Sequence, residues 1–165
     1  MILEPDIFHL PDFNLRLSES KKLDGMFASV MRSELLHTLF ASTKTEVSRI
    51  WAVQLTGLKH NPKLNLVISK NNLGDFKTTS AITQKQFEAQ LDQYDYDRQT
   101  SFYLDGFGVI SFMVIGVQVY PSFKIFQKIH HMDSSFLKKG RRKYRFLMQK
   151  LVEQNGLSIS LAQAS

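Results

Sequence analysis

The sequence predicts an α+β domain in which a mixed β-sheet is flanked by helices. Two observations lead to this prediction. Periodic segments follow one another in the order helix, three strands, helix, strand, helix. A nearly continuous apolar and β-branched run over residues 109–120 indicates a strand that is buried on both faces. The length of 165 residues suits one domain. We therefore assign a single domain to residues 1–165, with its core at about residues 20–156.

The first half of the chain is predicted to form one helix and three strands. Apolar residues recur at helical spacing over residues 20–41. Alternation of apolar and polar residues predicts strands over 51–55 and 64–68, paired across a turn at residues 60–62. A Thr-rich segment over residues 75–81 predicts the third strand.

The second half begins with a clear helix signal, because Thr83 and Gln86 form a capping box. Residues 98–106 fit either a strand or a helix by periodicity alone. The buried strand over residues 109–120 follows, with a neighbouring strand expected to begin at Phe123. A last helix is predicted from Ser134 or Ser135 to a stop near Asn155-Gly156.

Composition limits the chemistry and the location of the protein. The chain has no cysteine, which excludes disulfides and thiolate zinc sites and favours a reducing compartment, so we expect a cytoplasmic protein. The apolar run is too short to span a bilayer, so we expect no membrane association. Any bound metal must use oxygen or imidazole ligands.

The positive charge is concentrated near the C-terminal end of the chain. Residues 120–165 contain nine Lys and Arg but only two Asp and Glu, and the net charge of the whole chain is +6. Such a basic segment favours a polyanion such as nucleic acid, although a solvated helix face is the simpler explanation. The candidate residues are Lys138, Lys139, Arg141, Arg142, Lys143 and Arg145.

One short motif on the third predicted strand has the spacing of a catalytic pair. Asp75 and Lys77 are two residues apart, so strand geometry places both side chains on the same face of the sheet. A carboxylate there could hold Mg²⁺ while the ammonium group meets an attacking water. The tripeptide alone is common in proteins, so its context has to carry the interpretation.

That context resembles the RecE-type (exonuclease VIII-type) phage exonucleases of the PD-(D/E)xK nuclease superfamily. Residues 74–81 are similar to the Asp-x-Lys-Thr-Thr segment of that family, and residues 96–106 to its Tyr-x-x-Gln-x-x-x-Tyr-Leu-x-Gly helix. Residues 34–37, 46–48 and 140–144 resemble further family segments. The resemblance covers roughly residues 33–156 and implies a PD-(D/E)xK core in which residues 98–106 are helical.

The resemblance also implies roles for individual residues. Asp75 and His37 would hold Mg²⁺, or Mn²⁺ in its place. Lys77 would orient the attacking water, with Gln99 and Tyr103 positioning it. Phosphates would be bound by Thr78, Thr79 and the basic residues named above. The implied function is a Mg²⁺-dependent exonuclease for double-stranded DNA in phage-type recombination, working beside a single-strand annealing protein and forming a homo-oligomeric ring.

The sequence departs from the family at one expected metal ligand. Family members begin the second strand with Arg-Pro-Asp, whereas this chain has Asn61-Pro62-Lys63. An ammonium group at a ligand position repels Mg²⁺. The alternative hypothesis is therefore a nuclease-inactive protein that binds DNA or a protein partner with the same fold.

Two further groups of polar residues receive no chemical role from the sequence. His130 and His131 are adjacent and lack a third ligand at suitable spacing, so we expect surface residues. Asp95, Asp97 and Asp105 flank the predicted Gln99 helix, and we expect them to cap and solvate its ends.

Overall fold

A five-stranded mixed sheet forms the centre of the computed structural model, which describes residues 17–53, 57 and 59–154. The strand order is β1-β4-β5-β6-β7, and only the β5–β6 pair is parallel. The strands are β1 (Lys44–Ser48), β4 (Lys63–Ser69), β5 (Asn72–Thr79), β6 (Ser111–Gln118) and β7 (Ile125–His131). A separate two-stranded sheet pairs β2 (Trp51–Ala52) with β3 (Lys59–His60).

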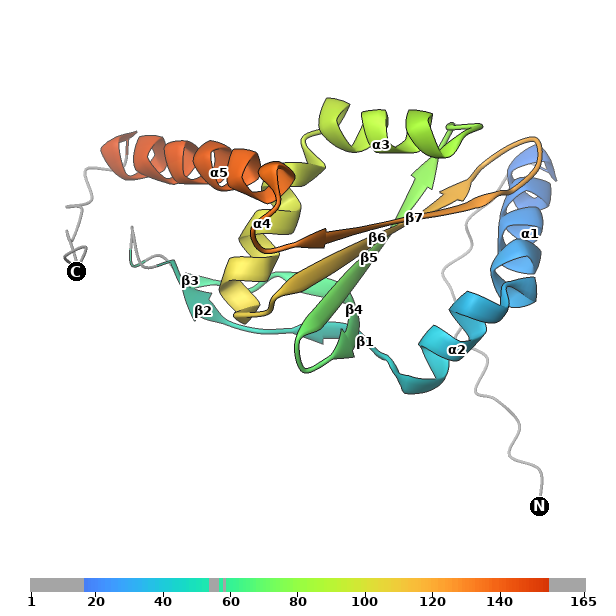
Figure 1. Cartoon of the computed structure of the whole chain (residues 1–165), viewed down its shortest axis with the longest axis horizontal. Coiled ribbons are helices and arrows are strands. Elements are labelled where there is room, and N and C mark those ends of the chain that lie inside the picture. The colour runs from blue at the N-terminus through green and yellow to red at the C-terminus, as the bar shows by residue number, and fades with distance from the viewer. Residues whose placement is uncertain (1–16, 54–56, 58, 155–165) are drawn as a thin grey trace, which may run out of the picture.

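Helices cover both faces of the large sheet (Figure 1). One face packs against α1 and α2, and the other against α3, α4 and α5. The helices are α1 (Leu17–Arg32), α2 (Glu34–Ser42), α3 (Gln84–Gln93), α4 (Tyr96–Phe107) and α5 (Ser135–Gln154). Within the described residues, no helix has both the length and the apolar character needed to cross a membrane.

The central strand β6 confirms the prediction from its apolar run. Seven of its eight residues are buried, as expected for a strand covered on both faces. Phe112 and Val114 face the larger core with α3, α4 and α5, whereas Ile115 faces the smaller core under α2. Because β5 runs parallel to β6, the segment containing α3 and α4 connects the two strands as a crossover.

The predicted helix over residues 20–41 is wrong as a single element, because the chain breaks at Ser33. Ser33 has an extended backbone and caps α2, which begins at Glu34. Its side chain accepts a hydrogen bond from the backbone N–H of Leu36. A serine in this position satisfies a backbone donor that the new helix leaves free. Helical spacing continues through the break, so apolar periodicity did not reveal it.

The predicted pairing of residues 51–55 with 64–68 is also wrong. Trp51 and Ala52 pair with β3, and β4 pairs instead with β1. The resemblance implied a strand at residues 46–48, which lie in β1, but periodicity did not predict it because β1 is an exposed edge with only one half-buried residue, Val47. Edge strands carry polar and charged side chains, so β1 lacks the apolar alternation that predicts a strand. Residues 54–56 lie outside the described part.

The remaining elements match their predictions in type and order, although β5 spans Asn72–Thr79 rather than residues 75–81. The capping box joins Thr83 and Gln86 at the start of α3. Residues 98–106 lie within α4, which confirms the helix that the resemblance implied. The last helix begins at Ser135 as expected, and its predicted stop at residues 155–156 lies outside the described part.

Candidate functional site

Asp75 and Lys77 form an ion pair on the β5 strand. The Nζ atom of Lys77 lies 2.6 Å from Oδ2 of Asp75, and the two side chains are 19% and 3% exposed. The residue between them, Phe76, points to the opposite face, where it stacks on Phe40 of α2. The alternation predicted from the sequence therefore holds, and the two charged groups share the face covered by α4.

The position of Asp75 coincides with the point where two strands separate. The β4–β5 pairing ends at Leu66 and Gly74, one residue before Asp75. The β5–β6 pairing, by contrast, continues to Thr79. From Asp75 onward, β5 is therefore hydrogen-bonded to a neighbouring strand on one side only.

An aromatic ring that the sequence analysis did not select completes the surroundings of Lys77. Its Nζ atom lies 4.8 Å from the ring centroid of Tyr96, the first residue of α4. Such a contact attracts an ammonium group to the ring face. Tyr96 is the first residue of the Tyr-x-x-Gln-x-x-x-Tyr-Leu-x-Gly match, so that match was the signal for it. Lys77 is thus held between a carboxylate and an aromatic ring.

The predicted residues Gln99 and Tyr103 share one helical face with Tyr96, because they follow it at intervals of three and four. Gln99 is half-buried. Tyr103 packs into the larger core, where its ring stacks on Phe112 at a centroid distance of 6.2 Å. This packing anchors the helix that carries Tyr96.

An open hollow of about 290 Å³ lies beside the end of β5. Thr78 is exposed at this hollow, whereas Thr79 is buried and its hydroxyl donates to Oε1 of Gln90 on α3. Thr79 also accepts a hydrogen bond from the backbone N–H of Ala81. Of the two predicted threonines, Thr78 is therefore the accessible one. The hollow is lined by Thr78, Thr79, Ser80, Gln90, Tyr94, Tyr96 and Val119.

The structure does not place His37 beside Asp75. His37 is exposed on α2, and α2 covers the sheet face opposite to Asp75, as the Phe40–Phe76 stack shows. Within residues 17–53, 57 and 59–154, no three His, Asp or Glu residues come together to hold a metal. Mg²⁺ binds in many phosphoryl-transfer sites through one or two carboxylates plus substrate phosphates and water. Of the two predicted metal ligands, Asp75 and His37, only Asp75 lies on the sheet face that carries Lys77.

Lys63 pairs with Glu46 and not with Asp75. Its Nζ atom lies 2.9 Å from Oε2 of Glu46 on the neighbouring strand β1, and the two side chains are 60% and 72% exposed. The ammonium group that replaces the expected aspartate is therefore neutralised at the exposed edge of the sheet. The partner of Asp75 is Lys77 rather than Lys63.

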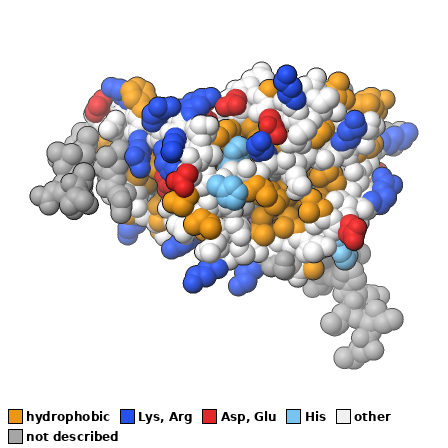
Figure 2. Space-filling view, in the orientation of Figure 1, with side chains coloured by type: hydrophobic (Ala, Val, Ile, Leu, Met, Phe, Trp, Pro, Cys, Tyr) orange, Lys and Arg blue, Asp and Glu red, His pale blue; other side chains and the backbone are white. Residues whose placement is uncertain are grey.

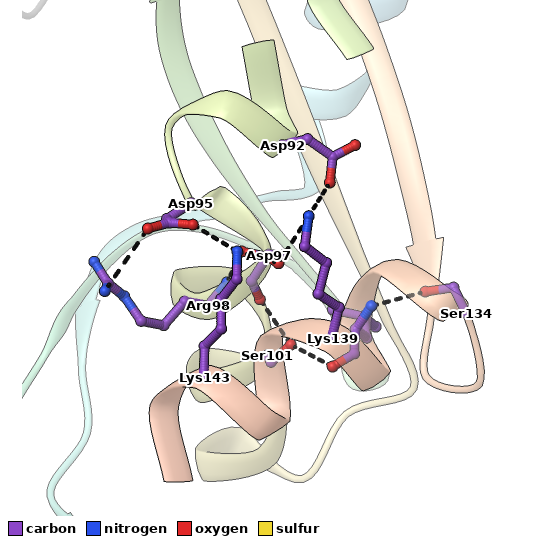
Figure 3. A network of polar contacts seen from close by, with 9 residues as sticks. Asp92, Asp95, Asp97, Arg98, Ser101, Ser134, Lys139 and Lys143 are labelled. Atoms are coloured by element: carbon purple, nitrogen blue, oxygen red, sulfur yellow. Dashed lines mark hydrogen bonds and ion pairs between the residues drawn. The ribbon is translucent and has the colours of Figure 1, made fainter. Parts of the chain in front are cut away.

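Half of the predicted basic cluster on α5 is engaged by acids, and Figure 3 shows two of these residues, Lys139 and Lys143. Lys143 lies 2.5 Å from Asp95 and 2.8 Å from the fully buried Asp97. Lys139 lies 2.9 Å from Asp92. Desolvation opposes the charge on Lys143, but its hydrogen bonds to Asp95 and Asp97 raise its pKa overall. The hydrogen bond from Lys143 also lowers the pKa of Asp95.

A second set of contacts joins the other end of α4 to α5. The Arg141 guanidinium lies 2.8 Å from Oδ1 of Asp105, and the Tyr144 hydroxyl donates to Oδ2 at 2.6 Å. The hydrogen bond to Asp105 raises the pKa of Arg141. Burial and the same carboxylate raise the pKa of Tyr144. Our expectation that Asp95, Asp97 and Asp105 cap and solvate helix ends is therefore wrong in part. Asp95 does occupy the N-cap position of α4, but all three aspartates bind cations of α5.

The histidine pair was also predicted incorrectly in part. His131 is exposed, but His130 is only 6% exposed and stacks on Phe136 at a centroid distance of 3.8 Å. Alternation along β7 turns every second side chain toward the helices, which is why the two neighbours differ. Burial, with Lys128 nearby, lowers the pKa of His130 to about 4.

No family model matches this sequence, and no curated protein matches it. Among solved structures, it is similar to a "putative exonuclease" from Eubacterium rectale, with a TM-score of 0.65 and 17% identity. That alignment covers 87% of this chain and 57% of the other chain. The chain is also similar to a phage-related exonuclease from Haemophilus somnus 129PT, with a TM-score of 0.51 and 14% identity, covering 89% and 78% of the two chains.

At these identities the similarity shows the fold. The predicted α+β architecture, a mixed sheet flanked by helices, is confirmed, and its fold is shared with these two solved structures. This chain spans little more than half of the length of the Eubacterium rectale protein.

Proposed function

We propose that this chain is a nuclease that hydrolyses double-stranded DNA from its ends, with Mg²⁺ or Mn²⁺ as cofactor. One observation carries the proposal. Asp75 and Lys77 lie together on one face of β5, where β4 separates from it, within a fold shared with proteins named as exonucleases. A carboxylate and an ammonium group in this arrangement suit in-line attack of water on a phosphodiester.

Each residue has a part in the proposed reaction. A divalent cation bound through Asp75 would stabilise charge on the phosphate and on the leaving oxygen. Lys77 would orient the attacking water, since its ammonium group is already fixed by Asp75 and by the Tyr96 ring. The exposed Thr78 hydroxyl would donate to a phosphate oxygen. Gln99, on the same helical face as Tyr96, would help to position Lys77.

The RecE-type assignment adds a biological setting to the proposal. The run from Asp75 through Gly106 supports it, as does the name of the phage-related structural neighbour. In this setting the enzyme resects DNA ends for phage-type recombination beside a single-strand annealing protein, and several copies form a ring around the duplex.

The test is Mg²⁺-dependent degradation of linear duplex DNA by the purified chain, with covalently closed circular duplex as the substrate control. Asp75→Asn and Lys77→Ala should each abolish degradation. Asp24→Asn and Lys70→Ala make the same changes at exposed positions and should leave it intact. Label at one end of each strand reports polarity. If the Lys77→Ala variant degrades linear DNA as fast as the native chain does, Lys77 does not have the proposed role.

A nuclease-inactive binding protein is the second candidate, and the donor set favours it. Asp75 belongs to no group of three acids or histidines among the described residues, and Lys63 stands where the family has an aspartate. Lys63→Asp should raise Mg²⁺-dependent cleavage if the missing acid limits the native chain, and Lys77→Ala added to it should remove the gain. Lys59→Asp, an equal charge reversal on β3, should give no gain. DNA binding without cleavage by any of these proteins would support the binding function.

A further inference from the structure

The helix α5 carries its basic residues on two faces with different surroundings. The inner face packs against α4 through Leu137, Gly140 and Tyr144, all of which are buried. Lys139, Arg141 and Lys143 flank this face, and each is paired with an aspartate of the α3–α4 segment. These three cations therefore form ion pairs within the protein.

The outer face presents three further cations, Lys138, Arg142 and Arg145, and all three are exposed. In the described part of the chain, none of them has a carboxylate partner. They follow one another at intervals of four and three, so they form one row along the helix, about 10 Å long at a rise of 1.5 Å per residue. Figure 2 shows Lys and Arg side chains gathered over the region of α5.

The row lies on a helix that is joined to the candidate site. Lys143 of the inner face binds Asp95, which directly precedes Tyr96, and Tyr96 contacts Lys77. A ligand bound along α5 is thus held by a helix whose position relative to the site is fixed by ion pairs (Figure 3).

We propose that Lys138, Arg142 and Arg145 form a phosphate-binding row that holds the DNA backbone, whereas Lys139, Arg141 and Lys143 hold α5 against α4. The choice of DNA rests on the proposed function. A row of exposed cations without carboxylate partners complements a regularly spaced polyanion, and contacts between such cations and phosphates supply most of the affinity that is independent of sequence.

The row is tested by binding of a fluorescent linear duplex in EDTA, where no metal-dependent cleavage occurs, over a range of salt concentrations. The test variant combines Lys138→Gln, Arg142→Gln and Arg145→Gln. Each lost phosphate contact should reduce the salt slope by about 0.9, so the total reduction should be about 2.7. The matched control, Lys21→Gln with Lys22→Gln and Lys70→Gln, removes the same charge from other exposed positions and should keep the native slope.

A charge-preserving variant, with Lys138→Arg, Arg142→Lys and Arg145→Lys, should also keep the native slope, which separates lost charge from a damaged helix. Equal slopes for the test and control variants would overturn the proposal, as would undetectable binding by the native chain at low salt. Binding to vesicles of acidic phospholipid that depends on the same three residues, without such dependence for DNA, would overturn it in favour of a membrane. Failure of nuclease activity alone leaves the binding result intact, because cleavage is measured separately with Mg²⁺.

Discussion

Two places in this molecule pair a buried aspartate with a lysine, and they serve different ends. On β5, Asp75 and Lys77 are two residues apart on one strand. Between the helices, Asp97 of α4 and Lys143 of α5 are far apart in the sequence. The helical pair joins two elements, so it contributes to the tertiary structure. The strand pair joins an element to itself, so its charges can be used for chemistry without loosening the fold.

The two pairs also differ in the number of ionic contacts around them. Between α4 and α5, each aspartate is paired with a cation of α5. Gly140 of α5 allows the backbones of the two helices to approach closely. Asp75 lies where β4 separates from β5, and its described ionic partner is Lys77. A buried charge is costly unless it is paired. On α4–α5 the ion pairs attach one helix to another, whereas on β5 the ion pair serves the nuclease function only if the proposed reaction is correct.

The largest expected effect on stability comes from Gly140→Ala, which disrupts the contact between α4 and α5. A Cβ atom at this position would lie 2.0 Å from the backbone oxygen of Asp97 and 2.4 Å from Oγ of Ser101. The two helices must then separate, which should lower the free energy of unfolding by about 3 kcal/mol. Urea unfolding measures this, with the exposed Gln149→Ala on the same helix as control. A loss below about 1 kcal/mol would show that the close approach is not required.

Lys143→Met is expected to cost about 2 kcal/mol of unfolding free energy, because Asp97 loses its nearest cation inside the protein. The value stays below that of a fully isolated charge, since Lys139 remains 3.9 Å from Asp97. Lys150→Met is the control, because Lys150 pairs with Glu153 on its own helix at the exposed surface. Equal losses for the two variants would contradict the special role of the α4–α5 pairs.

His130 provides a third case, a buried titratable group without a carboxylate partner among the described residues. Its pKa of about 4 lies below the usual 6.5, so the unfolded chain binds the extra proton first as the pH falls. Stability should therefore decrease as the pH is lowered from 6.5 toward 4, by on the order of 3 kcal/mol. His130→Gln should reduce this pH dependence in urea unfolding, whereas His131→Gln at the exposed neighbour should not. An unchanged pH profile for His130→Gln would show that His130 titrates normally.

The smallest expected effect on stability comes from removing the strand pair altogether. Asp75→Asn combined with Lys77→Met eliminates both charges, which should raise the free energy of unfolding by about 1 kcal/mol or leave it unchanged. The same double change at Asp97 and Lys143 should instead lower stability, because it releases α5 from α4. If both double variants lose stability equally, the distinction between the two pairs fails.

Local signals predicted a large part of the fold and the centre of the candidate site. The capping box at Thr83, the doubly buried β6 and the same-face placement of Asp75 and Lys77 depend on residues within one turn or one strand. The resemblance added the helical state of residues 98–106. Tyr96 was within reach of that match, but its ring contact with Lys77 depends on how α4 lies over β5.

The sequence by itself determined which residues carry charge, which strand is buried and which tripeptide has catalytic spacing, because these follow from chemistry and short-range periodicity. Only the tertiary structure decided which of those charges are used internally. Lys138 and Lys139 are adjacent in the chain, yet one is exposed on the outer row and the other binds Asp92. The packing of α5 on α4 decides which of these lysines is paired. It also brings Lys143 to Asp97 and Asp95, which lie 46 and 48 residues earlier in the sequence. Such distant pairing has no local signature, since it depends on which helix face is buried when the core forms.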